Sequence, residues 1–183
     1  MAIRYKTRFI PNEIYFITFT ILGWKHIFKQ RKYCDLVYKW FEHMKENYGN
    51  KIHGYVIMPN HIHLLIFITD RSPELKALIF NGKRFLGIGL KKILLEDRKN
   101  HLLNFFAERK TKSASHFAFF EPRYDSLQIT TQKFYLEKLN YIHNNPCSKN
   151  WNLADQPEEY SYSSASNYIL GKGIYEVDIT GFN

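Results

Sequence analysis

Apolar and polar positions follow regular periods along the first third of the chain. The run "EIYFITFTI" at 13–21 is rich in β-branched and aromatic residues, which is typical of a strand. Apolar residues then recur at steps of three and four between 33 and 48, which predicts an amphipathic helix that ends at Gly49. The runs 51–58 and 61–68 predict two further strands, joined by a turn at "MPN".

The chain after residue 70 carries weaker signals. "SPE" predicts a helix with Ser72 as its N-cap, and three glycines in the following residues predict that this helix kinks or breaks. "HFAFFEPRY" and "SLQIT" are short strand-like runs after a polar loop at 107–115. A last helix begins at Thr130 or Thr131 and runs through Asn144, where Pro146 stops it.

This order of elements predicts an α+β fold. We expect a ferredoxin-like antiparallel sheet with helices packed mainly on one face. The length of 183 residues and the hydrophobic content of 45% suit one core, so we expect a single domain over 1–150 and a tail over 151–183 that packs on it or extends from it.

Charge and cysteine content narrow the class of protein. The net charge of +9 favours a polyanion such as nucleic acid over an acidic small molecule. The longest apolar stretch, 64–68, is far shorter than the ~20 residues that cross a bilayer, so we expect no membrane segment. Cys34 and Cys147 have no metal or redox spacing, and no secretory signal precedes them, which favours a reducing cytoplasm.

Two histidines stand within the apolar run "HIHLLIFI". Residues i and i+2 of a strand share a face, so His61 and His63 project side by side while Ile62 and Leu64 point to the core. Two imidazoles on one face can converge on a cation, but they need a third ligand from elsewhere. On this pattern alone, a pair of partly exposed histidines without a ligand is an open alternative.

The helix "QKFYLEKLNYIHNNP" holds two tyrosines in different settings. At about 100° per residue, Tyr135 shares a core stripe with Leu139 and Ile142. Tyr141 lies about 120° from Tyr135, outside that stripe, and Asn145 follows one turn later on its side. A residue before proline is pushed away from helical geometry, which makes this last spacing less regular.

These residue types suit one reaction. A tyrosinate can attack a phosphodiester while a divalent cation polarises the phosphate and eases the departure of the sugar oxygen. Asn145 offers a neutral oxygen as a third ligand beside His61 and His63, and a hard ion such as Mg²⁺ or Mn²⁺ accepts it. A surface tyrosine without a chemical role is the simpler alternative for Tyr141.

Three blocks of residues carry a resemblance to a known family. "YVIMPNHIHLL", then "YIHNNP", then "PEEYSYSSASNY" resemble, in this order, the REP-associated tyrosine transposases, a single-tyrosine branch of the HUH nuclease superfamily. The resemblance extends from the "YFITF" strand to about Tyr168. The family's small residues after "NP" are replaced here by "CSKNW", which leaves the local conformation of the tail in question.

The resemblance implies an activity and a set of roles. It implies that His61 and His63 bind a divalent metal, Mg²⁺ or Mn²⁺, with Asn145 as third ligand. It implies that Tyr141 cuts single-stranded DNA near a hairpin or palindrome, forms a 5′-phosphotyrosine link and leaves a free 3′-OH. Residues 1–150 would then be the catalytic domain, in a bacterial cytoplasmic protein that joins the nucleoid when bound to DNA.

The residues that contact DNA do not follow from the motifs. The segment 83–112 carries nine Lys and Arg against three acidic residues, so we expect its basic side chains to bind phosphates. These are Lys83, Arg84, Lys91, Lys92, Arg109, Lys110 and Lys112.

Two alternatives to a mobile transposase remain, and the oligomeric state is also open. One alternative is a non-catalytic protein that binds single-stranded nucleic acid on exposed aromatic residues. The other is a host-domesticated nuclease that maintains repeats without moving its own gene. Both a monomer and a homodimer are compatible with the sequence.

Overall fold

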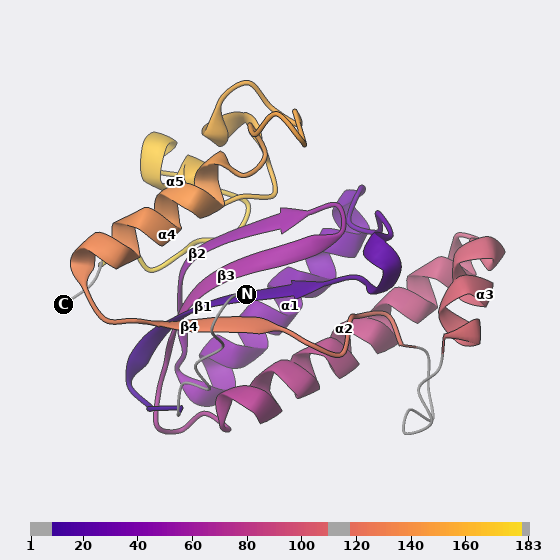
Figure 1. The fold of residues 1–183 in the computed structure, drawn as a ribbon, viewed down its shortest axis with the longest axis horizontal. Coiled ribbons are helices and arrows are strands. Elements are labelled where there is room, and N and C mark those ends of the chain that lie inside the picture. Colours follow the sequence, from indigo (N-terminus) through magenta and orange to yellow (C-terminus); the bar gives the residue numbers. More distant parts are fainter. Residues whose placement is uncertain (1–8, 110–117, 181–183) are drawn as a thin grey trace, which may run out of the picture.

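The protein is described here from a computed structural model, which covers residues 9–109 and 118–180. A four-stranded sheet forms its centre (Figure 1). The strands are β1 (Glu13–Thr20), β2 (Lys51–Met58), β3 (His61–Ile68) and β4 (Asp125–Ile129). Their order is β2-β3-β1-β4, and each strand is antiparallel to its neighbours. This is the predicted ferredoxin-like sheet.

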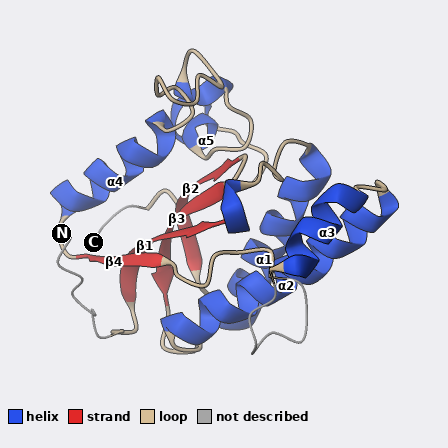
Figure 2. Cartoon of the chain, turned by 45° about the vertical axis from the view of Figure 1, so that its right-hand side comes forward, coloured by secondary structure: helices blue, strands red, loops and turns tan. Residues whose placement is uncertain are grey.

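Helices cover both faces of this sheet (Figure 2). Most of the helical residues lie on one side, as expected, in α1 (Arg31–Tyr48), α2 (Leu75–Glu96) and α3 (Asn100–Glu108), and α4 (Gln132–Asn144) and α5 (Ala165–Leu170) lie on the other (Figures 1 and 2). Among the described residues, no helix is both long and apolar enough to span a membrane. Single 3-10 turns lie at Leu22–Trp24 and Pro157–Glu159.

The alternation of side chains along the strands separates two cores. On β3, Ile62 and Leu64 belong to the large cluster beneath α1 and α2. Leu65 belongs to a smaller cluster beneath α4, together with Tyr135 and Leu139 of that helix. Because side chains on a strand alternate, the two histidines of β3 face α4. The predicted separation of Ile62 and Leu64 from the two histidines of this strand is confirmed.

The start and the glycines of α2 differ from expectation. The helix begins at Leu75 and not after Ser72, whose hydroxyl accepts a hydrogen bond from Asn50 Nδ2 at 3.2 Å and caps no helix. The glycines do not break α2, which runs unbroken to Glu96. A Cβ on Gly82 would lie 2.5 Å from the Trp40 ring of α1, so this glycine lets two helices approach closely.

The segments beyond α2 add elements that periodicity did not indicate. Helix α3 was not predicted, and it extends to Glu108 where a loop was expected from 107. In the described part of "HFAFFEPRY", the only strand pairing is a single bridge from Phe120 to Ile21, so the strand expected there does not form. The C-terminal tail bonds to the outer edge of β2, where Ile57 N–H donates to Tyr162 O at 2.9 Å.

Candidate metal and tyrosine site

The two histidines of β3 meet face to edge beneath α4. His61 Nε2 and His63 Nε2 are 3.1 Å apart, and the ring planes make an angle of 77°. Both residues are buried. A separation of this size brings two nitrogen lone pairs toward one point, which is the arrangement in which two imidazoles share a cation.

The second nitrogen of each imidazole has a partner of its own. Asn60 Oδ1 lies 2.6 Å from His61 Nδ1, and the Asn60 amide nitrogen points to Trp24 O at 3.5 Å. The Asn60 oxygen therefore faces the imidazole, so His61 Nδ1 carries the proton and Nε2 presents a lone pair. Thr18 Oγ1 lies 2.7 Å from His63 Nδ1, directly across the β1–β3 pairing. A hydroxyl can accept the Nδ1 proton in the same way.

Burial sets the charge of both rings. It lowers the pKa of His61 to about 4. Burial, followed by the charges of His61 and Lys138, lowers the pKa of His63 to about 3. Both imidazoles are therefore neutral near pH 7, and the neutral ring is the form that ligates metals.

Helix α4 brings Tyr141 onto this pair. The Thr131 side chain accepts from Phe134 N–H at 3.2 Å and caps the helix, as predicted. The Tyr141 ring makes an edge contact with His63 at 5.1 Å between centroids, yet 48% of the residue is exposed. Tyr135 is buried in the cluster beneath α4. The predicted contrast between a core tyrosine and an accessible one is confirmed.

Asn145 joins the histidines from the end of α4. It keeps helical dihedral angles, φ −56° and ψ −45°, so the irregular spacing expected before Pro146 does not occur. Its Nδ2 lies 3.3 Å from His63 Nε2, while its Oδ1 is buried with no hydrogen-bond partner among the described residues. A half-turn of the amide exchanges the two atoms and turns the oxygen toward the imidazoles.

This donor set fits a divalent cation. Two neutral imidazole nitrogens converge, and the buried amide oxygen of Asn145 has no partner in the described part of the chain. Within residues 9–109 and 118–180, no three His, Cys, Asp or Glu side chains gather as a metal site. The Asn145 amide can supply a neutral oxygen as a third ligand, which Mg²⁺ and Mn²⁺ accept together with water or phosphate.

Sequence reasoning missed two residues that border the site. Lys138 lies one turn before Tyr141, with its Nζ 5.9 Å from the Tyr141 ring centroid and 5.5 Å from that of Phe16. The Trp151 ring lies 5.6 Å from His61. The spacing of three residues between Lys138 and Tyr141 could have revealed the lysine. Trp151 had no such signal, because turns after Pro146 bring it back to the sheet.

Most of the predicted DNA-contacting residues lie away from this site. Helix α2, which carries four of them, packs on the opposite face of the sheet from α4 (Figure 2). Lys83 Nζ donates to Glu121 O at 2.8 Å and Arg123 O at 3.0 Å, and burial lowers its pKa to about 8. Lys83 thus ties α2 to the segment before β4.

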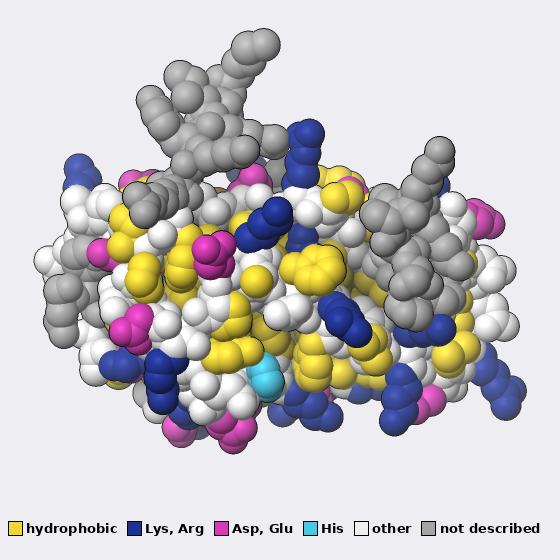
Figure 3. Space-filling view, turned by 90° about the horizontal axis from the view of Figure 1, so that it is seen from below, with side chains coloured by type: hydrophobic (Ala, Val, Ile, Leu, Met, Phe, Trp, Pro, Cys, Tyr) yellow, Lys and Arg dark blue, Asp and Glu magenta, His cyan; other side chains and the backbone are white. Residues whose placement is uncertain are grey.

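The other basic residues of this segment differ in setting. Arg84 and Lys92 are exposed, and Lys91 is half-buried. Arg109 stacks on the Phe105 ring at 3.8 Å. On the face seen from below, lysine and arginine side chains stand among apolar ones (Figure 3). Lys110 and Lys112 lie outside the described residues. Phosphate binding by this group stays a prediction.

Comparisons with known proteins bear on the fold. No protein-family model matches the chain, and no curated protein matches it. A solved structure of a REP-associated tyrosine transposase bound to a REP hairpin is similar, with a TM-score of 0.64 and 16% identity over 100% of this chain and 96% of the other. A candidate transposase from Deinococcus radiodurans R1 gives a TM-score of 0.40 and 14% identity over 78% of this chain and 97% of that one. The resemblance noted in the sequence blocks thus extends to the fold.

Proposed function

We propose that this protein is a metal-dependent endonuclease and strand transferase that acts on single-stranded DNA near a hairpin or palindrome. One observation carries the proposal: a tyrosine, two histidines and an asparagine, from segments about 80 residues apart, meet at one place. Packing explains Tyr135, but it does not explain why an exposed phenol stands on a buried histidine pair beside Asn145, whose amide oxygen has no hydrogen-bond partner among the described residues.

The proposed metal ligands are His61, His63 and Asn145. Asn60 and Thr18 would fix the orientation of the two imidazoles by accepting their Nδ1 protons. A bound Mg²⁺ or Mn²⁺ would polarise the scissile phosphate and neutralise charge on the departing oxygen. The buried position of the histidines keeps them neutral and ready to bind.

Tyr141 is the proposed nucleophile. Its phenolic oxygen forms a bond to phosphorus and loses its proton to solvent, and the bond from phosphorus to the sugar 3′ oxygen breaks. The 3′ oxygen takes up a proton and leaves as a free 3′-OH, while the 5′ phosphate stays on the tyrosine. Attack by a second 3′-OH would reverse these steps and join a new strand. The Lys138 ammonium lies on the same side of α4 and can bind a neighbouring phosphate oxygen.

DNA as the partner rests on charge and on the fold. The chain carries a net charge of +9, and a protein of the same fold has been solved with a REP hairpin. The same chemistry would serve a mobile transposase or a domesticated repeat-maintenance nuclease, and flanking palindromes in repeated copies would favour the former.

The test uses single-stranded DNA from the flanks of the gene, labelled at one end or the other, with Mg²⁺ or Mn²⁺. Label on the 3′ end should travel with the protein as a covalent adduct, and label on the 5′ end should appear as a shorter free strand that a polymerase can extend. Tyr141→Phe should bind the DNA and form no adduct, while Tyr135→Phe should still form one. Binding without any adduct from the wild-type protein would favour a non-catalytic nucleic-acid-binding protein.

A further inference from the structure

A cavity outside the proposed site lies between the segment that precedes α1 and the junction of α2 with α3. It encloses about 160 Å³ and is open to solvent. A water molecule occupies about 30 Å³, so the cavity has room for a group the size of a nucleobase or a phosphate. It is lined by His26, Ile27, Lys29, Gln30, Tyr33, Leu94, Lys99, His101 and Leu102.

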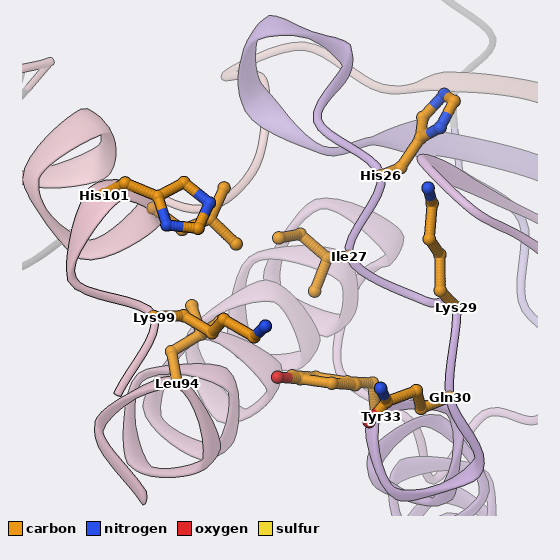
Figure 4. Close-up of a pocket in the computed structure, with 9 residues that line it drawn as sticks. His26, Ile27, Lys29, Gln30, Tyr33, Leu94, Lys99 and His101 are labelled. Carbon is orange, nitrogen blue, oxygen red and sulfur yellow. The ribbon is translucent and has the colours of Figure 1, made fainter. Parts of the chain in front are cut away.

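The walls of this cavity are basic on two sides. His26 and Lys29 stand on one side, and Lys99 and His101 on the other (Figure 4). Partial burial, and then the charge of Lys29, lower the pKa of His26. No carboxylate is among the described residues that line the cavity. Two ammonium groups with imidazoles between apolar walls suit an anion that carries a flat ring.

The acidic residue next to the cavity is already paired. Asp97 Oδ2 accepts a hydrogen bond from the Tyr33 hydroxyl at 2.7 Å, and Asp97 forms an ion pair with Lys32. These two partners lower the pKa of Asp97. The Lys32 ammonium and the Tyr33 hydroxyl are the direct partners of Asp97, and the charge of Lys99 acts on it more weakly.

The floor and the rim supply the remaining chemistry of a nucleotide site. Ile27 and Leu94 are buried and form an apolar floor on which a base can lie. Gln30 is exposed at the rim, and its amide can both donate to and accept from the edge of a base.

Aromatic contacts connect this cavity with the proposed cleavage site. The His26 ring lies 5.6 Å from the Trp151 ring, and the Trp151 ring lies 5.6 Å from that of His61. A strand with its scissile phosphate at His61 can therefore pass over Trp151, on which a base can stack, and reach His26 within a few nucleotides.

We propose that this cavity holds one nucleotide of the single-stranded arm next to the cleaved bond. The phosphate lies between Lys29 and Lys99, and the base lies on Ile27 and Leu94 within reach of Gln30. This inference rests on the proposed function, because it takes DNA as the partner, and it names where the unpaired part of that DNA is held.

The test measures binding of a fluorescent hairpin oligonucleotide with short single-stranded arms, without divalent metal so that no strand is cut. Lys29→Ala/Lys99→Ala should weaken binding of the armed hairpin roughly tenfold. It should also make the slope of log affinity against log salt shallower by about 0.7, the contribution of one phosphate contact on a single strand, because the two lysines share one phosphate. For a hairpin without single-stranded arms, the same double substitution should weaken binding far less.

The control variant removes the same charge elsewhere. Lys45→Ala/Lys76→Ala changes two exposed lysines, and Lys76 stands at the opposite end of α2 from Leu94, about 27 Å along the helix. The inference is wrong if the two double variants weaken binding equally. It is also wrong if Lys29→Ala/Lys99→Ala weakens binding of the hairpin without arms as much as binding of the armed hairpin. If adducts form on Tyr141 while Lys29→Ala/Lys99→Ala binds the armed hairpin like wild type, the inference is wrong and the proposed function stands. Failure of the wild type to bind any armed hairpin would instead overturn the proposed function.

Discussion

Replacing Thr18 tests whether the sheet orients the metal-binding histidines. Thr18 lies opposite His63 in the β1–β3 pairing, and its Oγ1 is 2.7 Å from His63 Nδ1. Thr18→Val keeps the shape and the β-branched side chain but removes the hydroxyl. His63 Nδ1 then loses the partner that holds its proton when Nε2 binds a cation.

Thr18→Val is expected to lower both the metal affinity and the folding stability of the protein. Loss of an outer partner of a metal-binding histidine lowers metal affinity by roughly 10- to 100-fold, or about 1.4 to 2.8 kcal/mol. Because His63 is buried, its unpartnered N–H also costs about 1 to 3 kcal/mol of folding free energy in the metal-free protein. Isothermal titration with Mn²⁺ measures the first quantity, and urea unfolding without metal measures the second.

Thr18→Ser is the matched control, because it keeps the hydroxyl and loses only a methyl group. It should bind Mn²⁺ within a few-fold of wild type. Wild-type affinity in Thr18→Val would refute the orienting role of the hydroxyl. A loss in Thr18→Ser as large as that in Thr18→Val would also contradict this role, because serine keeps the hydroxyl.

Three further predictions concern other parts of the molecule. Asn60→Ala should weaken Mn²⁺ binding in titrations by about 10-fold or more, because it frees the His61 tautomer. Gly82→Ala should destabilise the protein by about 1 to 3 kcal/mol in urea unfolding, because its Cβ meets Trp40. Gly87→Ala, whose Cβ only touches Phe119 at 3.4 Å, should be neutral or stabilising by up to about 1 kcal/mol. Burial lowers the pKa of His143 to about 4, as it lowers those of His61 and His63, so metal-free stability should fall as pH drops from 6.5 toward 4, and a flat profile there would contradict the burial of these three rings.

The spacing of apolar residues in the sequence was enough to predict the features that depend on a single strand or helix. The alternation in β3 separated Ile62 from the two histidines, and the angle around α4 separated Tyr141 from Tyr135. Both inferences use only the geometry of a single strand or helix, and tertiary packing did not change either. The strand bounds of β2 and β3 agreed for the same reason.

Features that depend on contacts between distant segments were not accessible in this way. Nothing near Lys83 in the sequence shows that its ammonium binds two backbone carbonyls of the segment before β4. Gly82 suggested a broken helix, but a tryptophan on a neighbouring helix fills the space that a side chain would take. Trp151 reaches His61 only because the chain turns back after Pro146. Each of these effects is set by a partner far along the chain.

The most direct test of the central claim is to identify the residue to which the DNA becomes covalently attached. Adducts formed with single-stranded hairpin DNA and Mn²⁺ can be digested with nuclease and protease, and mass spectrometry can locate the remaining nucleotide phosphate. The account predicts that it sits on Tyr141 and that Tyr141→Phe removes it. A phosphate on Tyr135 or on any other residue, or cleavage by Tyr141→Phe at the wild-type rate, would contradict the account.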